Sequence, residues 1–381
     1  MLRLMNLRVR NMNDPAGDRF RRCTTRDSIF SQWQWQLVLI LMLGSLFGVK
    51  HLPSFAKTYQ NQTSDQATQK NSHTPVLLGL YTPNYLGSQR TIDRELRQLD
   101  DWAGKRHSLA GFFMDIEDSN PAYNITNRLE LLRSNGYTAF INLDSTRSAA
   151  QIARGDVDRS LRKLAQAYAV WAKQGSERMA FIAPFQEMNI PGETYSKDPQ
   201  NFKLAYQRIQ EIFAEAGVSP NTVRWVFAPN GWSENAQHRF ENYYPGSDRV
   251  DVVAFSAYNW GHCSNASWKQ WNEPQEVFES YIQRMRVMAP GKPIFIAQTG
   301  TTSHTQSGAK SSAKDQWLRN SYTQLVAMGV RGILYFNIDK ECDWAFYNDR
   351  NHNSAGYRDA IANYAFGYVA PADLARMELA R

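Results

Sequence analysis

The amino-acid sequence predicts an α/β protein built as a single (β/α)8 TIM barrel. Short, nearly continuous apolar runs recur after residue 75, and a longer amphipathic stretch follows each of them. Such runs are typical of strands that are buried on both faces of a parallel sheet. Eight runs are present, the number that closes a parallel barrel: residues 76–81, 111–116, 137–143, 179–185, 224–229, 252–258, 293–298 and 332–336.

The stretches between the apolar runs have helical periodicity. Apolar residues recur three and four positions apart between residues 157 and 171, and Gly175 follows them. The same spacing is found between residues 202 and 216, with Gly217 directly after it. Glycine is common just past the end of a helix. We therefore expect helices whose apolar stripes pack on the barrel, and one barrel domain over residues 75–370.

The charge of the chain is concentrated at its start. The sequence has 43 Lys and Arg against 36 Asp and Glu, a net charge of +7. Residues 1–57 hold nine of the basic and three of the acidic residues, which leaves 34 against 33, or +1, for the rest. A nearly neutral barrel without a basic stripe is not expected to bind nucleic acid.

The first 74 residues have the composition of an export segment followed by a tether. Residues 1–36 are basic, residues 37–49 are apolar except for Ser45, and residues 50–74 form a polar linker. The apolar core of about 13 residues is shorter than the ~20 that span a bilayer and fits a signal peptide. Trp33 and Trp35 would suit an uncleaved anchor equally well. We expect a periplasmic, cell-surface or secreted protein, bound to the membrane by residues 33–49 if these are not cleaved.

Export bears on the three cysteines, because thiols tend to oxidise outside the cytosol. Cys23 precedes the apolar core, whereas Cys263 and Cys342 both follow it. Their even number in the exported part suggests a Cys263–Cys342 disulfide. Two isolated buried thiols are the alternative.

The chemistry of a (β/α)8 barrel lies where its strands end. Amides, carboxylates and aromatic rings predominate at these positions, and such groups bind sugar hydroxyls and the C–H faces of sugar rings. The seven histidines are scattered, and neither a metal-binding nor a phosphate-binding motif occurs, so we expect no metal and no cofactor. Trp232, Trp260, Trp271 and Trp344 are candidate sugar platforms. The strand-end residues are Tyr81, Asp115, Glu117, Asp144, Glu187, Asn189, Asn230, Trp232, Tyr258, Asn259, Trp260, Gln298 and Asn337.

Several sequence blocks resemble those of one glycosidase family. Residues 184–189, Pro-Phe-Gln-Glu-Met-Asn, are similar to the His-Glu-Met-Asn signature of glycoside hydrolase family 26, the β-mannanase family. Further blocks follow in the family's order at residues 225–230, 243–246, 258–261 and 290–297. The resemblance covers about residues 76–350 and implies the same barrel fold.

The family resemblance also implies hydrolysis with retention, by one glutamate acting as acid/base and another as nucleophile. Glu187 takes the acid/base role, and Asn189 is expected to hold the substrate. Gln298 stands at the nucleophile's position, and a neutral amide cannot attack the anomeric carbon. Gln186 and Ala183 likewise replace a His and an Arg that the family carries nearby.

Three hypotheses therefore remain open. The protein is a glycosidase in which another carboxylate completes an inverting pair, the candidates being Asp115, Glu117, Asp339, Glu341 and Asp343. Alternatively, it is a catalytically degenerate protein, membrane-tethered, that binds a polysaccharide or serves exopolysaccharide assembly. In the third hypothesis it is a scaffold without a sugar ligand. The first two imply a β-linked mannan, glucan or xylan, held by Asn189, Asn230, Trp232, Tyr258, Trp260 and Trp344.

Overall fold

The computed structural model describes residues 74–83, 89–118, 120–175, 177–266, 268–348 and 350–379. The predicted basic region 1–36, the apolar core 37–49 and nearly all of the linker lie outside these ranges. Among the described residues, no helix combines the length and the apolar character needed to cross a membrane.

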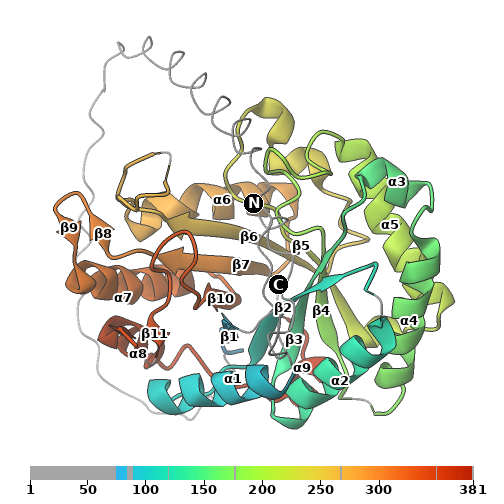
Figure 1. Cartoon of the computed structure of the whole chain (residues 1–381), viewed down its shortest axis with the longest axis horizontal. Helices are drawn as coiled ribbons and strands as arrows, with labels where there is room; N and C mark the ends of the chain where they lie inside the picture. The colour runs from blue at the N-terminus through green and yellow to red at the C-terminus, as the bar shows by residue number, and fades with distance from the viewer. Residues whose placement is uncertain are drawn as a thin grey trace, which may run out of the picture. The chain divides into compact units, whose positions relative to one another are not determined.

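Eight parallel strands of the described chain close into a barrel in the order β1, β10, β7, β6, β5, β4, β3, β2. Figure 1 shows the strands at the centre of this body. Each predicted apolar run overlaps one strand, so the predicted fold class is confirmed. The strands are β1 Leu77–Tyr81, β2 Leu109–Asp115, β3 Thr138–Asp144, β4 Ala180–Pro184, β5 Val223–Phe227, β6 Val252–Asn259, β7 Ile294–Thr301 and β10 Gly332–Phe336.

Helices surround the barrel strands (Figure 1). The two predicted helical stretches correspond to α4 and α5, whose apolar stripes are buried. Short hairpins, β8–β9 and β11–β12, lie in the connections around α7 and α8. The folded chain continues past residue 370, since Leu374 of α9 is buried. The described helices are α1 Gln89–Ala103, α2 Pro121–Ser134, α3 Ala149–Ala153, α4 Asp158–Ala172, α5 Pro199–Glu215, α6 Pro274–Met288, α7 Ser311–Ala327, α8 Ala355–Ile361 and α9 Pro371–Arg376.

The interior of the barrel changes from apolar to polar toward the carboxyl ends of its strands. The Phe181 ring lies 6.1 Å from Phe140 and 5.6 Å from Phe295, and all three side chains are fully buried. Two residues beyond Phe140, on the same face of β3, Asn142 donates from Nδ2 to the Tyr81 hydroxyl at 2.8 Å. The phenylalanine layer thus supports a layer of amide and hydroxyl groups.

Gly111 makes room for Tyr81 in this polar layer. A Cβ atom at Gly111 would lie 2.4 Å from the Tyr81 ring, well inside the contact distance of two carbon atoms. Any larger residue on β2 would therefore displace Tyr81 from its place beside Asn142.

Replacing Gly111→Ala should destabilise the protein by about 1–3 kcal/mol, because the added methyl group overpacks the barrel interior. Urea denaturation followed by tryptophan fluorescence measures this change. Ser312→Ala, at an exposed position of α7, is the control and should stay within about 0.5 kcal/mol of the wild type. An unchanged midpoint for Gly111→Ala would show that Tyr81 is not packed in this way.

Candidate functional site

A left-handed turn after β4 places Glu187. Phe185 and Glu187 have φ angles of 55° and 57°, a conformation that costs about 1–3 kcal/mol for residues other than glycine. The buried Phe185 ring packs 4.7 Å from the Tyr195 ring, and the Glu187 amide donates to the Ala228 carbonyl at 2.8 Å. These contacts hold the turn, so the Glu187 carboxyl stands at the carboxyl ends of β4 and β5.

The surroundings of Glu187 favour its protonated form. Burial raises the pKa of the Glu187 carboxyl, and hydrogen bonds from Ser256 and Asn230 offset part of that effect. The Asn230 Nδ2 donates to Glu187 Oε1 at 3.2 Å. Among nearby charges, Glu193 raises this pKa further and Lys340 lowers it. The result is a carboxyl group that can donate a proton at a higher pH than an exposed glutamate.

Asn189 is buried beneath the site, and both the nitrogen and the oxygen of its side-chain amide form hydrogen bonds. Its Nδ2 donates to the carbonyl oxygens of Asn230, Trp232 and His238 at 3.0–3.1 Å. Its Oδ1 accepts from the Asn230 amide at 2.9 Å. Since the side chain is 0% exposed, Asn189 fixes the loop that carries Asn230 and Trp232, and has no amide group left for a substrate.

Gln298 lies in the polar layer beside Ser256 of β6, whose side chain hydrogen-bonds to the Glu187 carboxyl. The Gln298 Cα is the register partner of Ser256, and Ser256 Oγ accepts from Gln186 Nε2 at 3.1 Å. The Tyr258 hydroxyl donates to Gln298 Oε1 at 2.9 Å. The position expected for a nucleophile is thus occupied by an amide that is held in place by a tyrosine.

Two of the carboxylates considered as partners for Glu187 are held in ion pairs. Glu117 binds Arg147 with Nη2–Oε1 at 2.9 Å, and Glu341 binds Lys340 with Nζ–Oε1 at 2.9 Å. Asp115 Oδ1 accepts from the Glu117 amide at 2.7 Å, while burial raises the pKa of the Asp115 carboxyl. Each of these groups therefore already has a structural contact.

The other two carboxylates fasten the loop after β10. Asp339 binds His352 with Oδ2–Nε2 at 2.9 Å and accepts from the Ala345 amide at 3.0 Å. Asp343 accepts a hydrogen bond from the Thr302 hydroxyl. These contacts do not by themselves prevent a catalytic role, but they explain the positions of both residues without one.

Five aromatic rings form a continuous row beside the site. The Trp344 ring lies 5.1 Å from Tyr258 and 4.9 Å from Trp260. Trp268 lies 5.8 Å from Trp260 and stacks on Trp232 at 6.4 Å. Trp232 and Trp268 are 45% and 47% exposed, whereas Trp344 is buried. We call these rings the aromatic row; its outer end is open to a ligand, and Trp344 supports its inner end.

Sequence reasoning named Trp271 as a platform and missed Trp268. Trp271 packs against the hydrophobic core, and its indole nitrogen donates to Glu273 Oε1 at 3.0 Å. Trp268, only three residues earlier, takes the exposed place in the row. The sequence signal for both was the same, a tryptophan in the long segment after β6.

A disulfide joins the two loops that carry most of the aromatic row. Cys263, after β6, is bonded to Cys342, after β10, with their Cα atoms 5.9 Å apart. The suggested disulfide is confirmed, and the alternative of two isolated thiols is wrong. Asn265 adds a hydrogen bond from Nδ2 to the Glu341 carbonyl at 2.6 Å. The two loops therefore form one covalently closed wall.

A buried lysine anchors this wall from below. Lys314 of α7 donates from Nζ to the carbonyl oxygens of Asp343 and Ala345, the latter at 2.9 Å. Burial lowers the pKa of Lys314 to about 8, although the nearby aspartates oppose this effect. Trp344 lies between these two carbonyl groups and is held by the same contacts.

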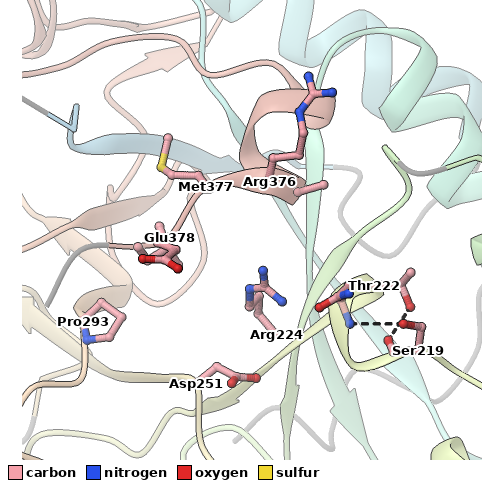
Figure 2. Close-up of a pocket in the computed structure, with 11 residues that line it drawn as sticks. Ser219, Thr222, Arg224, Asp251, Pro293, Arg376, Met377 and Glu378 are labelled. Atoms are coloured by element: carbon pink, nitrogen blue, oxygen red, sulfur yellow. Dashed lines mark hydrogen bonds between the residues drawn. The ribbon is translucent and has the colours of Figure 1, made fainter. Parts of the chain in front are cut away.

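A separate hollow lies at the opposite end of the barrel, near the starts of β5 and β7. Figure 2 shows Arg224 and Asp251 across from the carboxyl-terminal segment that carries Arg376 and Glu378. The hollow is framed by charges of both signs and lies away from the carboxyl ends of the strands. It contributes nothing to the site around Glu187.

No known family model matches the sequence, and no curated protein matches it. The chain does resemble solved β-mannanase structures, including family 26 enzymes. A β-mannanase from a symbiotic protist of the termite Reticulitermes speratus, complexed with gluco-manno-oligosaccharide, has 14% identity and a TM-score of 0.51, over 79% of this chain and 90% of that chain. The resemblance to family 26 is confirmed at the level of the fold.

Two further solved structures show the same relationship. A modular endo-β-1,4-mannanase from Cellulomonas fimi has 14% identity and a TM-score of 0.54, over 78% of this chain and 74% of that one. A β-mannanase from Bacteroides ovatus has 12% identity and a TM-score of 0.53, over 81% and 93%. The chain therefore has a glycoside-hydrolase-like barrel.

Replacing Asn189→Ala should lower the free energy of unfolding by about 1–3 kcal/mol, because it leaves buried backbone groups without partners. Chemical denaturation measures the loss. Asn221→Ala, on an exposed turn before β5, is the matched control. Equal stability of the two variants would contradict the structural role assigned to Asn189.

Replacing Glu187→Gln should change how stability depends on pH. A raised carboxyl pKa stabilises the folded state below the ordinary value of about 4.3, and that contribution is lost as the pH rises through the folded-state pKa. The variant lacks this titration, so it should become more stable relative to the wild type as the pH is raised from about 4 to 7. Denaturation at several pH values tests this, with Glu211→Gln on the exposed face of α5 as control. Parallel curves for wild type and Glu187→Gln would refute the raised pKa.

Proposed function

We propose that this protein hydrolyses O-glycosyl bonds of a β-linked polysaccharide, with Glu187 as its general acid/base. The observation that carries the proposal is the position of Glu187 where the barrel strands end. Its side chain is half-buried, its pKa is raised, and it accepts a hydrogen bond from Asn230. A general acid must be protonated at the working pH, and burial shifts Glu187 in that direction by raising its pKa. Glycosidases protonate the leaving oxygen with such a carboxyl group.

The aromatic row supports a sugar ligand next to this carboxyl. Sugar rings present C–H faces that pack on aromatic planes, and the exposed Trp232 and Trp268 offer such planes. Trp260 and Tyr258 continue the row toward Gln298. Mannan, glucan and xylan backbones are all candidates, and the β-mannanases that share the fold make mannan a natural first choice for testing.

A second candidate function is polysaccharide binding without cleavage, and Gln298 favours it. An amide keeps the shape and most hydrogen bonds of a glutamate but has no anionic oxygen for attack at the anomeric carbon. A cleft that has lost its nucleophile in this way can still bind a glycan chain. The wild-type protein would then serve polysaccharide recognition or assembly.

We propose that the protein lies outside the cytosol. The Cys263–Cys342 disulfide supports this location, because such bonds persist in oxidising compartments. The apolar run at residues 37–49 is the expected export segment. Membrane attachment through residues 33–49 depends on whether that segment is cleaved.

The proposal is tested by reducing-end release from mannan, β-glucan and xylan, together with binding of each polysaccharide to the full chain. Gln298→Glu restores a carboxylate opposite the acid/base, so it should cut at least one polysaccharide about 100-fold faster than the wild type. Adding Glu187→Gln to that variant should remove the gain, since general acid catalysis contributes about 10²–10⁴-fold.

Gln316→Glu makes the same chemical change at an exposed position of α7 and serves as the control. It should leave both binding and hydrolysis unchanged. If no variant binds any of the three polysaccharides, the glycan-cleft assignment is wrong. If Gln298→Glu binds a polysaccharide but never cuts it, Glu187 is not the acid/base.

A further inference from the structure

The site combines a complete acid/base with a missing nucleophile. Glu187 lies in a strained turn, its carboxyl pKa is raised, and the Asn230 amide donates a hydrogen bond to it. These are the features of a working proton donor. Gln298 cannot attack carbon, and the nearby carboxylates already hold loops and ion pairs. Cleavage with retention at this site therefore needs a nucleophile other than residue 298.

The polar layer also has buried amide atoms that lack hydrogen-bond partners. They are Gln298 Nε2, Gln186 Oε1 and Asn142 Oδ1, on side chains that are only 3%, 8% and 1% exposed. Each unsatisfied buried group costs about 1–3 kcal/mol, so buried polar atoms in proteins nearly always have partners. One donor and two acceptors thus lack partners within the polar layer. They have almost no exposed surface, so a ligand group reaches them only when side chains of that layer move.

Aromatic rings surround the unpartnered donor. The Tyr258 hydroxyl donates to Gln298 Oε1, and the Tyr81 hydroxyl also interacts with the Gln298 side chain. The Phe336 ring is 5.9 Å from Tyr81 and 6.4 Å from Tyr258. Such a setting suits a small ligand group with an apolar methyl end and a polar amide.

We propose that the sugar bound beside Glu187 carries a 2-acetamido group, which supplies the nucleophile that Gln298 cannot. The inference rests on the proposed hydrolysis with Glu187 as acid/base, and it replaces the mannan, glucan and xylan considered above with a β-linked 2-acetamido-2-deoxyhexoside. The acetamido carbonyl accepts from Gln298 Nε2, its N–H donates to Gln186 Oε1, and its methyl group packs among the aromatic rings. A 2-hydroxyl would satisfy the same atoms but would leave the reaction without a nucleophile.

The reaction proceeds in two steps. In the first, the acetamido carbonyl oxygen bonds to the anomeric carbon, the glycosidic C–O bond breaks, and Glu187 gives its proton to the departing oxygen. The sugar becomes a cyclic oxazolinium ion, whose positive charge is balanced by the new Glu187 carboxylate. In the second, Glu187 takes a proton from water, whose oxygen attacks the anomeric carbon as the ring opens and the acetamido group reforms. Two inversions give net retention, as in glycosidases that use substrate assistance.

The test compares three β-1,4-linked hexasaccharides of the same backbone: N-acetylchitohexaose, its de-N-acetylated form and cellohexaose. The full-length wild-type chain should cut the N-acetylated sugar at least about 100-fold faster than the other two, with the β-anomer as first product by proton NMR. Glu187→Gln should cut none of them. Gln298→Glu should gain activity on cellohexaose, because the protein then provides the carboxylate.

N-trifluoroacetyl substitution is the sharper measurement, since it weakens only the carbonyl nucleophile. The wild type should cut this analogue at least 10-fold more slowly, whereas Gln298→Glu should be less affected. Release of the α-anomer, or equal rates on N-acetylated and 2-hydroxyl sugars, would overturn the inference. If the wild type cuts cellohexaose as fast as the N-acetylated sugar, the acetamido inference fails while the proposed hydrolysis stands. If only Gln298→Glu cuts and the wild type cuts nothing, the acetamido inference and hydrolysis by the wild type both fail, and polysaccharide binding remains. If no variant cuts any sugar, both fail.

Discussion

Burial of the Glu187 carboxyl is the constraint on which the functional end of the barrel depends. A desolvated acid needs a rigid frame, because water would otherwise return and lower its pKa. The left-handed turn at Phe185 and Glu187 provides one part of that frame. The hydrogen-bonded side chain of Asn189 provides another part, because it fixes the loop from which Asn230 donates a hydrogen bond to the Glu187 carboxyl. The left-handed backbone of this turn costs conformational free energy. The packing of the Phe185 ring against Tyr195 offsets that cost.

The opposite wall depends on links between distant parts of the chain. The Cys263–Cys342 disulfide closes a segment 79 residues long, and cross-links over such lengths remove much of the unfolded chain's freedom. Lys314 and Asp343 add polar anchors beneath it. The wall carries most of the aromatic row and lies beside Gln298. The aromatic rings and the Gln298 amide therefore keep fixed positions relative to each other. A sugar bound on the aromatic row would therefore keep a fixed position relative to Glu187.

The strands and the strand-end residues could be predicted because they depend on local pattern. Strands buried on both faces give continuous apolar runs, and strand ends in a parallel barrel share one face. The role of Asn189 could not be predicted, since its partners lie about 40 residues away. The contacts of Glu117 and Asp343 likewise join residues 30 and 41 positions apart. The even number of cysteines after the apolar core suggested the disulfide. Only the folded structure, which brings Cys263 next to Cys342, shows that they are bonded and are not two separate thiols.

A crystal structure of the full chain with a bound β-linked oligosaccharide tests the role of this site most directly. We expect an oxygen between two sugar units within about 3.2 Å of the Glu187 carboxyl, with sugar rings packed along Trp260, Trp268 and Trp232. An oligosaccharide bound only elsewhere, for example in the hollow at the opposite end of the barrel (Figure 2), would contradict the assignment of Glu187 as the residue that acts on the glycosidic bond.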